Sequence, residues 1–200
     1  MRALGFSFFL LALLSACNNS SPSVPLSSSE PEPSRHTIAN PQYQSWENFP
    51  LGTSVRHRAV TRQEGQEKET VTTMIYKLIE STPEQVKVEL QTKSVRYDGI
   101  ETANPSRTFL YPAQLQVPEL PAKKVAENGE EMIRIGEWEY STRWQKTKDR
   151  NEAGDVFTQV WSSSQVPGGF VKSIMRTPAI GVTTTTELIE VRQPENVRTR

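Results

Sequence analysis

The sequence lacks most of the side chains that catalytic and metal sites require. Its 200 residues include one cysteine and two histidines, His36 and His57. A single cysteine cannot form a disulfide within the chain, so stability must come from a packed core. Metal sites need clustered Cys, His or carboxylate ligands, and the sequence shows no such spacing. We therefore expect no metal, no cofactor, no catalytic residues and a non-enzymatic protein; a hydrolytic carboxylate pair, which leaves no spacing signature, is the minor alternative.

An excess of charge of one sign is also missing. The chain carries 23 basic and 23 acidic residues, and neither sign forms a long run. Nucleic-acid binding normally requires a basic face, and electrostatic membrane binding requires a polybasic patch. The sequence therefore predicts neither a nucleic-acid partner nor a polybasic membrane contact.

The amino terminus gives the single cysteine a role. Arg2 precedes an apolar run of about 12 residues, which is too short for a membrane-spanning helix. The run ends in Leu14-Ser15-Ala16-Cys17, which resembles the lipobox of bacterial lipoproteins. The resemblance implies cleavage before Cys17 and a lipid on its sulfur that anchors the protein to a membrane. The alternative is an ordinary secreted protein with an unpaired cysteine.

The residue after this cysteine bears on location. Such proteins are retained in the inner membrane by Asp at this position, and the chain has Asn18 instead. We therefore expect a lipid-anchored protein of the cell envelope, on the outer membrane facing the periplasm rather than on the inner membrane.

Composition divides the chain into four parts. Residues 1–17 form the signal peptide, and residues 18–42 are rich in Ser and Pro. Such a segment buries too little apolar surface to offset its conformational entropy, which predicts a disordered tether, with a Pro-rich docking peptide as the alternative. Residues 43–193 have the size of a single domain, and residues 194–200 form a polar carboxyl-terminal tail.

The domain has the period of β-strands. Residues 86–90 and 138–144 alternate apolar with polar side chains, whereas only residues 43–49 suggest a short helical turn. Gly136 suits a two-residue hairpin turn that pairs Ile135 with Trp138 and Ile133 with Tyr140. These patterns predict an all-β, antiparallel domain with at most one or two short helices.

A second predicted hairpin turns at residues 63–66. That turn would place Arg62 opposite Glu67 and Val55 opposite Met74. Both predictions depend on the length of the turn, because the turn sets the register of the two strands.

The strand at residues 72–79 is apolar on both faces. One face carries Met74, Tyr76 and Leu78, and the other carries Thr73, Ile75 and Ile79. Both faces should therefore be at least partly covered. Residues 99–130, which hold four prolines, could supply a covering loop.

Three aromatic residues share one face of another strand: Trp138, Tyr140 and Trp144. With Met74, Tyr76 and Leu78 they are the candidate ligand-facing residues. Two interpretations are open: an ordinary core, which aromatic residues commonly build, or a groove for an acyl chain or a glycan.

A lipobox, a polar tether and a long meander containing Trp46, Phe49 and a Trp161…Val-Pro-Gly-Gly-Phe-Val hairpin resemble envelope proteins of the LolA-like type. The resemblance implies a strongly curved, incomplete β-barrel (a half-barrel or open barrel) around a short helix. Several such proteins carry lipid or lipoprotein acyl chains. The leading hypothesis is therefore a curved sheet that binds or shields an apolar ligand or a lipid-bearing partner. The alternative is an envelope scaffold or protein-interaction module with a filled core; the oligomeric state is open.

Overall fold

In the computed structural model, residues 35–118 and 127–194 are described, and they belong to one compact unit. The signal peptide, Cys17 and most of the carboxyl-terminal tail lie outside these ranges. The elements, in chain order, are β1 (Arg35–Ala39), α1 (Pro41–Gln44), β2 (Ser54–Gln63), β3 (Thr70–Ser81), β4 (Gln85–Val95), β5 (Glu101–Pro112), β6 (Gln114–Pro118), β7 (Glu127–Ile135), β8 (Trp138–Asn151), β9 (Gly154–Ser162), β10 (Phe170–Thr177), the 3₁₀ turn η1 (Pro178–Ile180) and β11 (Val182–Arg192). The all-β prediction is confirmed.

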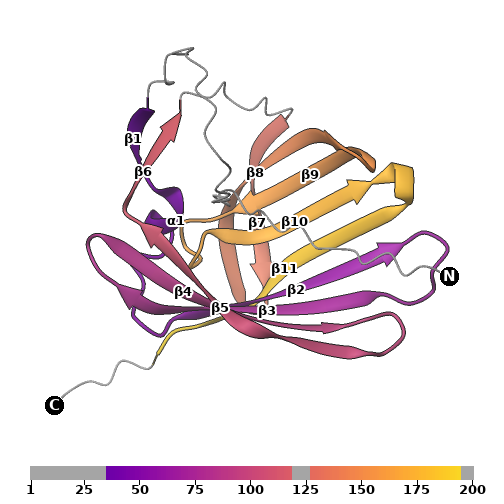
Figure 1. The fold of residues 1–200 in the computed structure, drawn as a ribbon, viewed down its shortest axis with the longest axis horizontal. Helices are drawn as coiled ribbons and strands as arrows, with labels where there is room; N and C mark the ends of the chain where they lie inside the picture. The colour runs from indigo at the N-terminus through magenta and orange to yellow at the C-terminus, as the bar shows by residue number, and fades with distance from the viewer. Residues whose placement is uncertain (1–34, 119–126, 195–200) are drawn as a thin grey trace, which may run out of the picture. The chain divides into compact units, whose positions relative to one another are not determined.

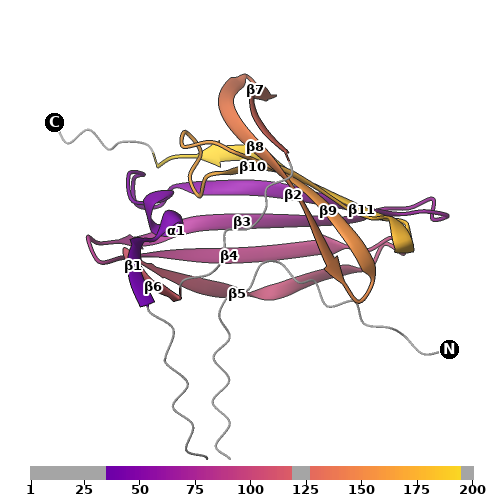
Figure 2. The same ribbon diagram turned by 90° about the horizontal axis from the view of Figure 1, so that it is seen from above.

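Nine strands form one antiparallel sheet in the order β5-β4-β3-β2-β11-β10-β9-β8-β7. The edge strands β5 and β7 do not pair with each other, so the sheet is open. The sheet curls, and β7 approaches β11, which lies four places inward in the strand order. Figure 2 shows β8 and β9 crossing the direction of β2 and β3. The predicted open, curved antiparallel meander is therefore confirmed.

A separate two-stranded ribbon corrects the predicted tether, which was expected to extend to residue 42. Residues 35–39 form β1, which pairs antiparallel with β6 and places Ile38 opposite Leu115. Helix α1 then begins at Pro41, and the side chain of Asn40 caps its amino terminus. Composition missed this strand because its backbone hydrogen bonds come from a partner far along the chain. Residues 18–34 lie outside the described residues.

The core is built where α1 and the turn after it meet the curved sheet. Trp46 is buried there and packs against Gly168 in the turn between β9 and β10. The Gly168 backbone N–H donates to the Ser45 carbonyl oxygen at 2.9 Å, which ties the two turns together. The other buried apolar residues of this cluster are Tyr43, Val55, Leu78, Val86, Val88, Trp161, Val166, Val171 and Leu188.

The two predicted hairpins differ in outcome. The β7–β8 register is confirmed, because Ile135 lies opposite Trp138 and Ile133 lies opposite Tyr140. The β2–β3 prediction is wrong by two residues, since Val55 lies opposite Tyr76 rather than Met74.

The cause of this shift is a longer turn. β2 ends at Gln63 and β3 begins only at Thr70, so the turn is wider than the two-residue loop that the sequence suggested. Arg62 consequently forms its ion pair with Glu69 instead of Glu67.

Strand β3, which the sequence predicts to be apolar on both faces, is covered mainly on one face. Met74 and Leu78 are buried, and Thr73 and Ile75 are half-buried on the other face. Ile79 is exposed because it is a bulge residue, inserted where the register steps from Leu78–Val88 to Glu80–Lys87. The predicted covering loop at residues 99–130 is wrong in its described part, which forms β5, β6 and the start of β7.

His57 is a buried histidine in the middle of the sheet. Its Nε2 lies 3.1 Å from the Phe170 carbonyl oxygen, and its Nδ1 has no hydrogen-bond partner. The imidazole also contacts the rings of Tyr76 and Phe170, with centroids 5.8 and 5.0 Å away. This arrangement fits a neutral ring with its proton on Nε2, and burial lowers the pKa of His57.

We expect the stability of the protein to fall in mild acid. The unfolded chain takes up a proton on His57 near pH 6.5, whereas the folded chain takes it up only at lower pH. Stability is therefore complete above about pH 6.5 and declines by up to about 1.4 kcal/mol per pH unit below it, until the folded pKa is reached. Urea unfolding at a series of pH values measures this, and a His57→Gln variant should lack this component of the slope. An unchanged slope in the variant would contradict the assignment.

Candidate functional site

The six predicted ligand-facing residues do not form one surface. Met74 and Leu78 of β3 are buried within the protein, and Tyr76 beside them is half-buried. Burial raises the pKa of Tyr76 to about 12. On β8, Tyr140 and Trp144 are half-buried against the core, whereas Trp138 is 72% exposed at the tip of its hairpin.

Two of the clefts in the described part of the chain are well enough formed to compare with ligand sites, and neither is lined by these six residues. One, of about 260 Å³, lies beside Ile75, Lys77 and Arg192. The other, of about 250 Å³, lies between β1 and α1 beside Ile38 and Tyr43. Pockets for small-molecule ligands usually have volumes of about 300–1,000 Å³, so both clefts fall below that range.

Residues 35–118 and 127–194 contain neither a cluster of potential metal ligands nor a helix that could span a membrane. No group of three or more His, Cys, Asp or Glu side chains there lies close enough together to hold a metal ion. None of the helices in these ranges has the length and apolar character needed to cross a bilayer.

The clearest candidate for a functional surface is the free edge of β5. Among the described residues, β5 pairs only with β4, so its other side offers backbone N–H and C=O groups to a further strand. The row of directly opposed residues Leu78, Val88 and Phe109 runs from the core to this edge. Leu78 and Val88 are fully buried, whereas Phe109 is 36% exposed. The apolar core thus ends at β5 with a partly uncovered ring.

The last part of β5 carries no charge. Residues 108–112 read Thr-Phe-Leu-Tyr-Pro. The rings of Phe109 and Tyr111 stack with centroids 6.3 Å apart and an interplanar angle of 10°. Leu110, on the opposite face, is 51% exposed. Natural edge strands usually carry charges, prolines or bulges that prevent pairing, and none of these lies between Arg107 and Pro112.

The start of this open segment is marked by a bulge. The β4–β5 register steps from Leu90–Arg107 to Thr92–Asn104, so Pro105 and Ser106 together face one residue of β4. Proline is tolerated there because an edge strand or a bulge does not require its missing N–H. The segment available for pairing therefore runs from Ser106 to Pro112.

A hydrogen-bonded corner fixes the end of this segment. Asn40 donates from Nδ2 to the Pro112 carbonyl oxygen at 2.7 Å, and the Ala113 N–H donates to the Glu84 carbonyl oxygen at 2.7 Å. Tyr43 donates its hydroxyl to the Thr82 carbonyl oxygen at 3.1 Å. The β3–β4 turn thus holds both α1 and the end of β5.

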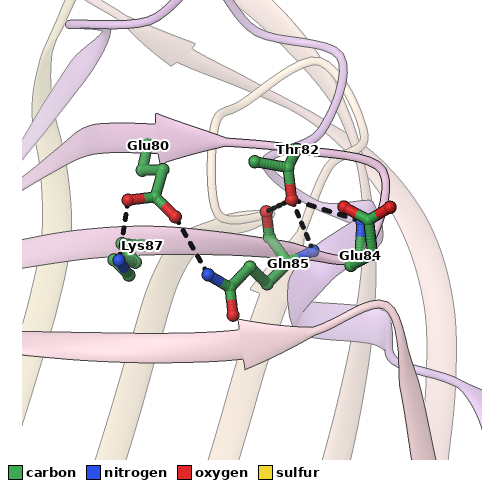
Figure 3. A network of polar contacts seen from close by, with 5 residues as sticks. All are labelled: Glu80, Thr82, Glu84, Gln85 and Lys87. Carbon is green, nitrogen blue, oxygen red and sulfur yellow. Dashed lines mark hydrogen bonds and ion pairs between the residues drawn. The ribbon is translucent and has the colours of Figure 1, made fainter.

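The β3–β4 turn is itself held by side chains (Figure 3). The Glu80 carboxylate accepts from Lys87 Nζ at 2.7 Å and from Gln85 Nε2 at 2.9 Å. Both contacts hold the pKa of Glu80 below its usual value. The Thr82 hydroxyl accepts from the backbone N–H groups of Glu84 and Gln85, at 3.3 and 3.2 Å. This network keeps β4, the only described partner of β5, in place.

The opposite edge of the sheet is protected. β7 reads Glu-Asn-Gly-Glu-Glu-Met-Ile-Arg-Ile, with three carboxylates in nine residues. Glu127 and Glu130 form ion pairs with Lys146 and Arg143 of β8, which gives this edge a charged border. Because charges along an edge oppose the addition of a strand, β7 is a natural control for β5.

The β5 edge was missed from the sequence because four prolines suggested a loop. Pro105 lies in a bulge and Pro112 ends the strand, so both are compatible with an edge strand. The signal that could have found it is the uncharged run from Thr108 to Tyr111, which contains two aromatic residues and a threonine, all common in strands.

Comparisons with known proteins give fold neighbours with little sequence identity. No protein-family model matches the chain, and no curated protein matches it either. A protein from Bacteroides fragilis, provisionally described as exported and as having a YmcC-like fold, is 8% identical, with a TM-score of 0.46 over 78% of this chain and 100% of its own. A protein from Parabacteroides distasonis, provisionally described as a lipoprotein, is 12% identical, with a TM-score of 0.43 over 72% of this chain and 97% of its own. A DUF1329 family protein from Desulfovibrio piger is 4% identical, with a TM-score of 0.26 over 75% of this chain and 88% of its own. All three TM-scores are below 0.5.

Proposed function

We propose that the protein is a lipid-anchored, non-enzymatic module of the bacterial cell envelope that binds an extended polypeptide along the β5 edge. The lipobox at Leu14–Cys17 supports the anchor. The free edge between Ser106 and Pro112 supports the binding mode, in which a partner strand extends the sheet.

The observation that carries this proposal is the contrast between a filled interior and an open edge. Trp46, Leu78, Val88 and Leu188 occupy the space where an enclosed apolar ligand would lie, and all four are buried. At the edge, Phe109 and Leu110 are partly uncovered on the two faces of one strand. An added strand would cover both and would satisfy the outward backbone groups. A carrier of acyl chains is therefore less favoured than an interaction module.

Site-specific photocrosslinking in the full chain tests the proposal. A photoreactive phenylalanine analogue replaces Leu110 on β5 or Met132 on β7, which is similarly exposed, at 61%. After irradiation of intact cells, we expect protein adducts from position 110 and few from position 132. A second change, Thr108→Lys, should strongly lower the adducts from position 110, because a lysine on an edge strand opposes pairing. Equal adducts from both edges, or none from position 110, would contradict the proposal.

A further inference from the structure

The β5 segment itself has the features of a strand that could pair with its own free edge. A strand that pairs with β5 must not place a charged side chain opposite a like charge. It must also place apolar side chains beside Phe109. Ser106–Pro112 is itself exposed along most of its length, extended and of this pattern, so the segment can pair with a second copy of itself.

We infer that β5 pairs with β5 of a second copy of this chain, antiparallel and about a two-fold axis at Phe109. The inference rests on the proposed function, because it names the occupant of the same edge. It joins two nine-stranded sheets into one continuous sheet across the axis. Homo-oligomers most often use such two-fold, self-complementary contacts.

The register follows from the faces of the strand. Phe109 and Tyr111 lie opposite Val88 and Val86, on the core side, whereas Leu110 lies opposite Lys87 on the other side. Directly opposed residues point to the same face of a sheet. If the core sides of the two copies lie on one side of the joined sheet, one residue of β5 must therefore lie opposite the same residue of the second copy, at the two-fold axis. An axis at Phe109 uses the whole segment from Ser106 to Pro112, whereas an axis at Leu110 shortens the pairing and one at Thr108 brings in the Pro105 bulge.

The side chains are self-complementary in this register. Phe109 faces Phe109 of the second copy at the axis, and Arg107 lies opposite Tyr111 on each side of it. Aromatic pairs and cation–π contacts are both favourable across strands. The single charge of the segment, Arg107, does not meet itself. On the other face, Thr108 lies opposite Leu110 and covers part of its exposed surface.

The lipid anchor proposed above would favour such pairing. Two copies held at one membrane surface meet at an effective concentration far above that of free chains, which assists a short interface. The same confinement applies to the β7 edge, but the charged side chains along that edge oppose the addition of a strand. The anchor therefore favours β5 pairing without favouring pairing in general.

Disulfide trapping in the full chain, in membranes of the producing cells, tests the register. Directly opposed residues of antiparallel strands have Cα atoms about 4.5–5.5 Å apart, within the range of a disulfide. We expect Phe109→Cys to give a reducible dimer after mild oxidation, at least about ten-fold more than Met132→Cys, because the anchor confines both variants equally but only the β5 edges place the two sulfur atoms directly opposite each other. Leu110→Cys alone should stay largely monomeric, since its expected neighbour is Thr108. Co-producing Leu110→Cys with a differently tagged Thr108→Cys chain should recover a mixed dimer. The wild-type chain, whose one cysteine, Cys17, is expected to carry the lipid on its sulfur, is the baseline.

The outcomes separate this inference from the proposed function. If Phe109→Cys gives no more dimer than Met132→Cys, or if Leu110→Cys dimerises as well as Phe109→Cys, the two-fold pairing at Phe109 is wrong. The mass of the photoadduct from position 110 then shows whether the partner at the β5 edge is a second copy or another protein. An adduct of twice the chain mass identifies a second copy. An adduct of another mass overturns the second copy and leaves the edge as a docking site, and the absence of any adduct overturns both.

Discussion

Replacing Leu78 with alanine is expected to lower the free energy of unfolding by about 2–5 kcal/mol. Leu78 is fully buried, lies opposite Val88, and starts the apolar row that reaches the β5 edge. Its backbone is also fixed, because its N–H donates to the Thr53 carbonyl oxygen and its C=O accepts from Gly52, both at 2.9 Å. The backbone therefore cannot move in to fill the space that the shorter side chain leaves, so the cost should lie in the upper part of the range.

The neighbouring bulge residue supplies the control. Ile79 loses a similar apolar volume on substitution by alanine, but it is 40% exposed and lies outside the core. We expect Ile79→Ala to cost less than about 1 kcal/mol, within the scatter of surface substitutions. Chemical denaturation followed by tryptophan fluorescence measures both variants, and equal costs would show that Leu78 is not in a rigid core.

Gly168→Ala is the second substitution with a large expected effect. Gly168 occupies the third position of the turn from Val166 to Gly169 and has a φ of 78°. Residues other than glycine lower the stability by about 1–2 kcal/mol in this backbone conformation. A Cβ at this position would also lie 3.0 Å from Cζ2 of Trp46, which is buried and cannot retreat easily. Overpacking of this kind typically adds about 1–3 kcal/mol, so we expect a total loss of about 2–5 kcal/mol.

A Gly65→Ala variant serves as the control that separates the backbone cost of Gly168→Ala from its steric cost. It has nearly the same φ, 79°, and a Cβ there meets no atom within 4 Å. Gly65→Ala should therefore show only the backbone cost of about 1–2 kcal/mol. The difference between the two variants measures the contact of the β9–β10 turn with Trp46. If both variants lost the same stability, Trp46 would have room to move and the two turns would not be firmly packed.

The sequence predicted best where the pairing of strands is local. Gly136 and its two flanking apolar pairs were enough to give the β7–β8 register, because a two-residue turn leaves no freedom in alignment. The β2–β3 register was wrong by two residues because Gly65 also fits a wider turn, and no side chain near it distinguishes the two lengths. Strand β1 could not be found locally, since its partner β6 follows more than 70 residues later.

The candidate site shows the same limit. Alternation placed Met74, Tyr76 and Leu78 on one face correctly, but it could not show that α1 and its neighbours fill the space over that face. The exposure of Trp138 at a hairpin tip was likewise invisible, because the same alternation describes a core strand and a protruding one. The position of β5 at an edge follows from the order of nine strands, which depends on long-range contacts.

The β1–β6 ribbon is the first described structure that a pull from the amino-terminal side would load. Any pull along the chain that comes from Cys17 reaches Arg35 first, at the end of β1 that pairs with Pro118. Because that load acts on one end of the ribbon, it would unzip the pairs one after another rather than shear them together. Peeling the five residues of β1, which span roughly 16 Å at about 3.3 Å per residue, would move the point where the chain leaves the fold from Arg35 to the Asn40 cap. Under such a load, the two strands of the ribbon would thus separate before any strand of the nine-stranded sheet.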